Sequence, residues 1–260
     1  MQSSSRLHRQ FFRNGPSHRA GADVSFADLV TLFGFNSIHI GRWVTAAEQQ
    51  IAANLFFDAF ADLQHILQVP AEVISLRGSL ALTFGIGGQP GVCAFYQPKG
   101  RILALAKNAG AGSLAHEWWH AFDHYIASKM FAEPAAGIFA SRLWLSQAKL
   151  KPHPLNNLLD SAFQALLLSE DQQAPSPFFR HCQQLDAAAN RLYLALPEEM
   201  AARAFEKVIQ CQAVKNHFLV AGTLQGAAAA RGIYPDNTLT QQLSLLWLRY
   251  FKLLADSLQR

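Results

Sequence analysis

The chain has 260 residues, half of them hydrophobic and 15% charged, with a formal net charge of +4 at pH 7. So many apolar side chains can form a sizeable core, which excludes wholesale disorder. The longest apolar runs are far shorter than the roughly 20 residues that cross a bilayer, so we expect no membrane-spanning segment.

The N-terminal segment is basic. It contains Arg6, Arg9, Arg13 and Arg19 and no acidic residue, and the other basic residues of the chain equal its 18 acidic ones in number. Such a segment suits either contact with nucleic acid or another acidic partner, or a mobile terminus. Apart from one Phe–Phe pair, it lacks aromatic residues for stacking on bases. We therefore predict a basic, flexible tail over residues 1–22 and no nucleic-acid function.

Two features indicate the compartment. The sequence does not begin with the apolar segment of a secretory signal. Cys93, Cys182 and Cys211 show no CxxC spacing, which suits free thiols in a reducing cytosol. We therefore predict a cytoplasmic protein.

Two helices and a small sheet are predicted first along the chain. The stretch "SFADLVTLFGF" predicts a helix capped by Ser25 and ended by Gly34, and apolar spacing predicts an amphipathic helix over residues 45–67. Four short apolar stretches, bounded by Gly and Pro, then predict the strands of the sheet. They are "EVISLRG", "SLALTFGIG", "GVCAFYQP" and "GRILALAK".

Helices fill most of the remaining sequence. We predict one helix over about residues 113–130, with Ser113 as its N-cap, and another over about residues 197–210 that begins at Pro197. Helices, a small sheet and then further helices describe an α+β fold. Without linkers or repeats, we expect a single domain over residues 23–260.

The sequence "HEWWH" carries the clearest chemical motif. On a helix, His116 and His120 lie one turn apart on the same face, so both imidazoles can bind one zinc ion. Glu117 is turned by about 100° and lies beside the ion, where a carboxylate can act as general base toward water. The motif is short, and a structural histidine pair is an equal alternative on these residues alone.

A third ligand must come from elsewhere. His124 lies about 12 Å along the helix from His116, too far for both to bind one ion on a straight helix. Asp123 stands where a metzincin has a turn-forming glycine, which excludes that class. Asp123 is therefore either an acceptor that orients an imidazole or a surface acid.

The helix over residues 197–210 offers three further acids. Glu198 and Glu199 lie in its first turn and Glu206 two turns on, and its alanines permit close approach to another helix. A structural interpretation fits the same spacing at least as well. In it, the two first-turn acids favour the helix dipole and Glu199 pairs with Arg203.

A longer stretch around the motif resembles a known family. "GRILALAKNAGAGSLAHEWWHAFDHY" is similar to the zincin-like domain of large polyvalent proteins from phages and mobile elements. The resemblance covers most of residues 31–250, without the basic tail and a segment around residues 131–175. It extends through "FGFNSIHIGRW", "VISLRGSLALTFG", "EEMAARAFE", "KNHFLV" and "IYPDN". The HEWxH core also resembles the protease domain of calcium-activated chloride channel regulator proteins. The resemblance implies a zincin-like metalloprotease fold.

The resemblance also implies a third ligand. In glutamate-zincins this ligand is the first Glu of an ExxAxAF-like helix, which "EMAARAF" places at Glu199. Arg203 departs from the pattern, because anthrax lethal factor has a second acid there.

Further roles follow from the same resemblance. Zincins bind the substrate as an added strand along a sheet edge, and "GVCAFYQP" with Val92 to Tyr96 is the expected edge. A group that stabilises the oxyanion is also expected. Tyr193, close before Glu199, is our first candidate, and Tyr125 is the second, with a structural role in the core as its alternative.

We therefore predict a zinc-dependent peptidase that acts on a peptide or protein substrate. Zn²⁺ is its expected cofactor, bound by His116, His120 and Glu199, with Glu117 and Tyr193 as catalytic residues. The alternative is a metal-stabilised binding module of mobile-element origin without turnover. The sequence indicates no particular substrate, cleavage motif or oligomeric state.

Overall fold

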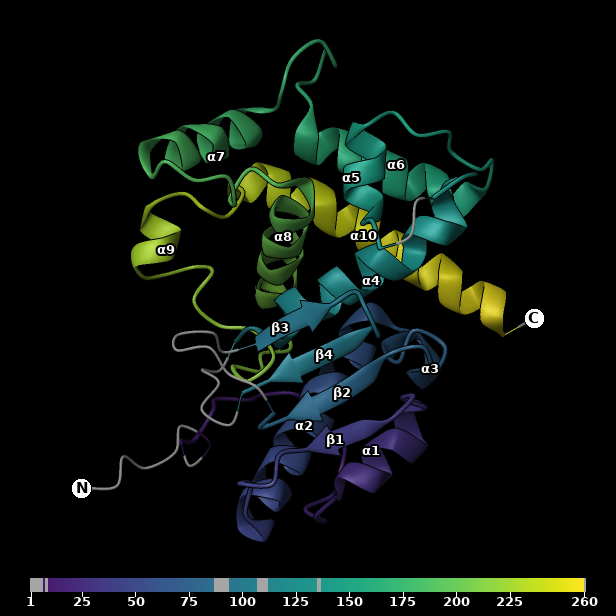
Figure 1. Ribbon diagram of the computed structural model, residues 1–260, viewed down its shortest axis with the longest axis vertical. Coiled ribbons are helices and arrows are strands. Elements are labelled where there is room, and N and C mark those ends of the chain that lie inside the picture. The colour runs from purple at the N-terminus through teal and green to yellow at the C-terminus, as the bar shows by residue number, and fades with distance from the viewer. Residues whose placement is uncertain (1–6, 8, 87–93, 107–111, 135–136, 260) are drawn as a thin grey trace. The chain divides into compact units, whose positions relative to one another are not determined.

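The computed structural model describes Leu7 and residues 9–86, 94–106, 112–134 and 137–259 (Figure 1). The chain divides into two compact units. They are Met1–Ala121 with Gln212–Ala221, and Phe122–Cys211 with Gly222–Arg260. The division falls inside one helix, after Ala121, and the single domain expected over residues 23–260 stays a prediction.

The first unit combines helices with a four-stranded sheet. Its elements are α1 (Phe26–Phe33), β1 (Ile38–Ile40), α2 (Ala46–Leu67), α3 (Ala71–Ile74), β2 (Ala81–Phe84), β3 (Ala94–Gln97), β4 (Ile102–Leu105) and the first turns of α4 (Leu114–Met130). Ser25 accepts a hydrogen bond from the backbone N–H of Asp28 and so caps α1, and Gly34 ends that helix with a φ of 70°. Both confirm the sequence prediction.

The strand order of the sheet is β1-β2-β4-β3. The first three strands in this order are parallel, and β3 is antiparallel to β4, with Ala94 opposite Leu105. Because parallel strands end on the same side of a sheet, β4 leads into α4 at the side where β1 and β2 also end. Three of the four predicted strand stretches contain β2, β3 and β4.

Two details of the sheet differ from the prediction. The stretch "EVISLRG" is not a strand, because Pro70 starts the short helix α3 and the N–H groups of Val73 and Ser75 bond to carbonyls before them. Leu76 and Arg77 then take left-handed backbone conformations, which end any extended run. Conversely, β1 was not predicted, since three residues are too short to show a period of two.

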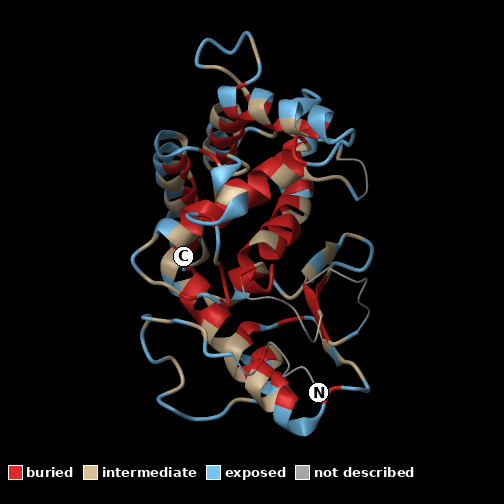
Figure 2. Ribbon diagram, turned by 90° about the vertical axis from the view of Figure 1, so that its left-hand side faces the viewer, coloured by how far each residue is buried: buried red, intermediate tan, exposed pale blue. Residues whose placement is uncertain are grey.

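Aromatic rings fill the core of the first unit. Phe26, Phe33, Phe56, Phe60 and Phe84 are all buried, and the ring centroids of Phe56 and Phe60 lie 6.0 Å apart. These residues come from α1, α2 and β2, so the predicted apolar faces meet in one cluster. Figure 2 shows such buried positions in red along the helices and the sheet.

The described part of the N-terminal segment packs against this unit. Arg13 and His18 both bind the buried carboxylate of Asp62 on α2, and Arg19 pairs with Asp58 one turn earlier. Leu7 is only 4% exposed. Within the described residues, Arg13, His18 and Arg19 of the segment predicted as a flexible tail thus have acidic partners on α2.

The second unit is helical in its described residues. Its elements are the end of α4, α5 (Ala140–Leu145), α6 (Pro154–Leu167), α7 (Pro177–Ala188), α8 (Pro197–Cys211), α9 (Ala227–Ala230) and α10 (Asn237–Leu258). Its core contains the fully buried Phe122, Phe205, Trp247 and Phe251, and α10 packs along α6 and α8. The predicted helices over 113–130 and 197–210 correspond to α4 and α8.

The α+β prediction is therefore confirmed by the helices and the small four-stranded sheet of the described residues. Among the helices of the described residues, none combines the length and the apolar composition needed to cross a membrane.

Candidate metal centre

Two buried tryptophans fix the helix that carries the motif. Trp118 and Trp119 are fully buried, and the indole Nε1 of Trp118 donates a hydrogen bond of 2.9 Å to the carbonyl of Ile74. Since a buried indole N–H needs an acceptor, this bond sets both the position and the rotation of the first turns of α4. His116 and His120 then share a face that differs from that of Trp118.

The start of α4 is held by the segment around residues 216–221. The N–H groups of Gly112 and Ala115 donate to the carbonyls of Phe218 and Leu219 at 3.1 and 3.0 Å. Gly112 has a φ of +99°, and a Cβ there would lie 2.6 Å from the backbone nitrogen of Ala221, so only glycine fits this close approach.

Ser113 directly precedes α4, as predicted, but its side chain does not cap the helix. Its carbonyl accepts the N–H of Glu117, as expected for the residue before the helix. Its buried hydroxyl makes no hydrogen bond with the described residues, so the side-chain cap was predicted wrongly. The backbone bond from Ala115 to Leu219 satisfies one N–H of the first turn instead.

The two histidines point their Nε2 atoms toward each other. The Nε2 atoms of His116 and His120 lie 3.1 Å apart, with ring centroids at 4.8 Å. Two imidazole nitrogens this close are stable together when a proton or a metal ion lies between them. Zinc–nitrogen bonds of about 2.0–2.1 Å at a tetrahedral angle separate two nitrogens by about 3.3 Å. The observed distance therefore fits two ligands of one zinc ion.

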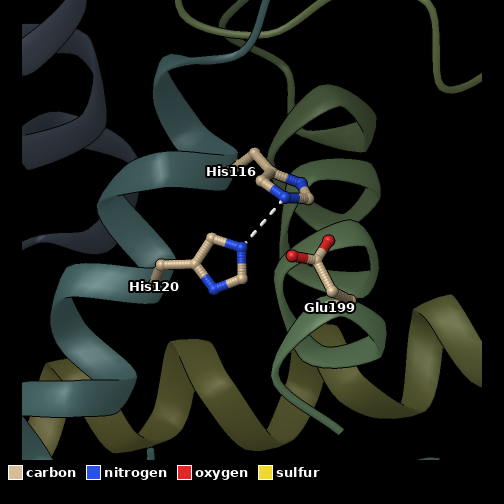
Figure 3. A group of neighbouring side chains, drawn as sticks. All are labelled: His116, His120 and Glu199. Carbon is tan, nitrogen blue, oxygen red and sulfur yellow. Dashed lines mark hydrogen bonds between the residues drawn. The ribbon is translucent and has the colours of Figure 1, made fainter. Parts of the chain in front are cut away.

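Glu199 completes a set of three possible ligands. Figure 3 shows His116 and His120 on α4 and Glu199 on α8 pointing toward one another. One ligand atom from each residue lies within 4.8 Å of the other two, so this group could hold a metal ion. Two imidazoles and one carboxylate are a set that catalytic zinc sites use, with the fourth position left for water or substrate.

The other acids of α8 have different surroundings. Glu198 forms an ion pair with Arg142 of α5, with Arg142 Nε 3.2 Å from one carboxylate oxygen. Glu206 is buried two turns beyond Glu199, and its charge contributes to a raised pKa of Tyr234, after the larger effect of burial. The ligand set therefore contains Glu199 and neither neighbour.

Arg203 does not form the pair with Glu199 that was the structural alternative to a metal ligand. Its Nη2 donates instead to the carbonyl of Leu194 and lies 3.7 Å from the sulfur of Cys182. Spacing by four residues made a Glu199–Arg203 pair plausible, but Arg203 is 4% exposed and turned toward the segment before α8.

Asp123 is not a surface acid. It is fully buried, and its two oxygens accept hydrogen bonds from the backbone N–H and the hydroxyl of Ser141 at 2.9 and 2.6 Å. Asp123 thus joins α4 to the start of α5. Whether it also orients an imidazole stays a prediction.

The predicted catalytic residues lie in contrasting environments. Glu117 is 9% exposed, and none of the described residues donates a hydrogen bond to its carboxylate. Tyr193 is 44% exposed, and the guanidinium of Arg191 lies 5.6 Å from its ring centroid. Tyr125 is half-buried with Lys129 over its ring. The catalytic roles of all three stay predictions.

The predicted edge for substrate is an edge of the sheet. β3 pairs with β4 on one side, and its residues alternate between half-buried and exposed. Val92 and Cys93, which were included in that prediction, lie outside the described residues.

Comparison with known proteins relates part of the chain to a family. Residues 185–258 match the family model described as Large polyvalent protein-associated domain 1. The match includes α8 with Glu199, and it supports the expected relation to large polyvalent proteins. The HEWWH motif lies outside the matched residues, so the zincin character stays a prediction. No curated protein and no solved structure matches the chain.

Two residues that hold the starts of α4 and α8 were not predicted from the sequence. Asn216 accepts the N–H groups of Phe218 and Leu219 and so shapes the segment bonded to the start of α4. Asp186 likewise accepts three backbone N–H groups of residues 193–195, just before α8. Side chains that bind backbone groups follow no periodic pattern, so no sequence signal marked either residue.

Proposed function

We propose that this protein hydrolyses peptide bonds in a zinc-dependent reaction, with His116, His120 and Glu199 as the metal ligands. The observation that carries the proposal is the 3.1 Å separation of the two Nε2 atoms, with a carboxylate oxygen of Glu199 within 4.8 Å. The chemistry of these donors favours zinc over magnesium or calcium, since both of those prefer all-oxygen sites.

Glu117 would carry out the proton transfers. A zinc ion bound here would polarise the scissile carbonyl and lower the pKa of a water molecule to about 7. Glu117 follows His116 directly, is largely buried and is not one of the three possible ligands, which suits a carboxylate that acts beside a metal. It takes a proton from the attacking water and delivers it to the leaving nitrogen. In this mechanism Tyr193 donates a hydrogen bond to the developing oxyanion.

An extended peptide is the substrate that suits the sheet. β3 is an antiparallel edge strand, and a peptide can pair with such an edge through its backbone. Recognition through backbone groups sets little sequence preference by itself, so selectivity would come from side chains around the site.

A metal-stabilised interaction module is the second candidate. It is favoured by the match of residues 185–258 to a domain associated with large polyvalent proteins, since such a domain can serve recognition within a larger assembly. The two candidates share the metal ligands and differ in the need for Glu117.

One experiment separates them. Protein purified without chelator is assayed for metal by mass spectrometry and incubated with a proteome-derived peptide library. The same assays are applied to Glu117→Gln. We expect bound zinc in both proteins and cleavage by the wild type alone, with a rate loss of about 10²–10⁴-fold in the variant. Zinc in both proteins with equal cleavage, or with none, would contradict the peptidase proposal.

A further inference from the structure

One buried carboxylate holds the turn before α8. Asp186, near the end of α7, accepts hydrogen bonds from the backbone N–H groups of Tyr193, Leu194 and Ala195 at 2.9, 2.9 and 2.8 Å. Burial alone would raise the pKa of Asp186, but these three N–H groups, together with the charge of Arg191, hold it below its usual value. The carboxylate is therefore ionised at neutral pH, and its three hydrogen bonds are charge-assisted.

Arg203 holds the same turn from the other side. It lies on α8, one helical turn after Glu199, and its Nη2 donates to the carbonyl of Leu194. The N–H and the carbonyl of Leu194 are thus bound by Asp186 and Arg203 respectively. The turn is fixed by side chains on the helices before and after it.

The burial of Arg203 at this position is unfavourable for the stability of the fold. Its Nε and Nη1 are buried and make no hydrogen bond with the described residues. A buried guanidinium with unsatisfied donors destabilises the folded state relative to an apolar side chain of similar size. Fold stability alone does not explain why a charged residue stands here.

The start of α8 lacks an ordinary cap. Leu196, the residue before the helix, has no side-chain oxygen that could accept an N–H of the first turn. A first turn without a cap tends to fray. Glu199 is the third residue of α8, so fraying would displace it. The bonds of Asp186 and Arg203 to residues 193–195 restrict such movement.

We propose that Asp186 and Arg203 are positioning residues that fix the first turn of α8, so that Glu199 meets the metal together with His116 and His120. A ligand must be held within about 0.5 Å of its productive position, which a frayed turn does not provide. This inference rests on the proposed metal site and adds the device that places its carboxylate. In the described part of the chain, neither Asp186 nor Arg203 forms a hydrogen bond with His116, His120 or Glu199.

The test compares two full-length variants that each lose one carboxylate. Asp186→Asn places an amide NH₂ against backbone N–H donors. The control is Asp160→Asn on α6. It removes a carboxylate whose Oδ1 accepts a hydrogen bond of 2.6 Å from the indole Nε1 of Trp144. Zinc affinity is measured by competition with a chromophoric chelator, and the visible absorption of bound Co²⁺ reports the ligand geometry. Thermal unfolding of the metal-free proteins reports fold stability.

We expect Asp186→Asn to lower zinc affinity by about 10–100-fold and to change the cobalt absorption bands. Asp160→Asn should keep both close to wild type. Unchanged bands in folded Asp186→Asn would overturn the inference even if affinity falls, because loss of a negative charge weakens cation binding without moving a ligand.

A second variant decides the matter if Asp186→Asn does not fold. Arg203→Lys keeps the charge and loses the rigid guanidinium that reaches the carbonyl of Leu194. We expect changed cobalt bands here too, and unchanged bands would overturn the inference. If the wild type binds neither zinc nor cobalt, the proposed function itself fails and this inference falls with it. If the wild type binds metal and both variants keep its affinity and cobalt bands, the positioning role is wrong and the proposed metal site stands.

Discussion

Arg13 and Asp62 form a two-pronged ion pair. Arg13 Nε and Nη2 lie 2.6 and 2.8 Å from the two carboxylate oxygens of Asp62, which is fully buried on α2. His18 and Asn216 bind the same carboxylate at 2.9 and 2.8 Å. Asp62 thus joins the N-terminal segment to the segment that holds the start of α4.

The first prediction is that this pair stabilises the protein. Arg13→Met should lower the free energy of unfolding by about 1–2 kcal/mol, because a buried carboxylate loses two of its hydrogen bonds while Arg13 itself is partly exposed. Urea denaturation measures the change. The control is Arg9→Met, since Arg9 is exposed in the same segment and should change stability by less than about 0.5 kcal/mol. Equal stability of wild type and Arg13→Met would show that the N-terminal segment does not depend on Asp62.

The N-terminal segment illustrates what the sequence could not reveal. Four arginines without a nearby acid suggested a solvated tail, because the partners of Arg13 and Arg19, Asp62 and Asp58, lie about forty or more positions away in the sequence. A helix such as α2 was predictable, since its apolar spacing and its Thr45 start are local. Ion pairs between distant segments leave no local pattern.

The second prediction concerns alkaline pH. Burial, and then the charge of Tyr125, raises the pKa of Tyr250, whose ring packs against Phe122 and Phe251. A raised folded-state pKa contributes stability that is complete below the unfolded value of about 10 and is lost as the pH rises above it. The free energy of unfolding of Tyr250→Phe, relative to wild type, should therefore increase by up to about 1.4 kcal/mol per pH unit above pH 10.

Denaturant unfolding at several pH values between 7 and 11 measures this difference. Between pH 7 and 9 it should stay constant, which serves as the internal control. A difference that also stays constant up to pH 11 would mean that Tyr250 ionises in the folded state as readily as in the unfolded one.

The third prediction is that metal stabilises the fold. An ion held by ligands from α4 and α8 binds the folded protein, so zinc at 100 times its Kd should raise the free energy of unfolding by roughly 2.7 kcal/mol. Thermal unfolding with zinc and with chelator measures the effect. In the double variant His116→Ala/His120→Ala, neither zinc nor chelator should change thermal unfolding. A wild type whose unfolding is also insensitive to both would indicate a histidine pair that binds no metal.

The ligand group shows a second limit of the sequence. The spacing of His116 and His120 predicts a shared face on any helix, and the structure places their Nε2 atoms together. Spacing did not separate Glu198 from Glu199, because both lie in the first turn of α8 and only the resemblance distinguished them. Their partners separate them: Glu198 pairs with Arg142, whereas Glu199 has a ligand atom near both histidines.

The fourth prediction tests that distinction by zinc affinity. Glu199→Ala removes one of three ligands and should lower zinc affinity far more than any neighbouring change, and Glu199→Gln should also lower it, because a neutral amide oxygen is a weaker ligand than a carboxylate. Glu198→Ala loses an ion pair whose Arg142 side chain is half exposed, so it should cost little stability and leave zinc affinity within about tenfold.

Glu206→Ala supplies the second control. Its carboxylate is seven residues from Glu199, about 10 Å along the helix axis, and so should not replace it as ligand. Competition with a chromophoric chelator gives the affinity of each variant, and mass spectrometry gives the metal content. Full zinc content with wild-type affinity in Glu199→Ala, or a larger loss in Glu206→Ala than in Glu199→Ala, would assign the third ligand to another residue. A loss confined to the Glu199 variants would assign the third ligand to Glu199, since Glu198 is turned away by about 100° and Glu206 lies about 10 Å farther along the helix.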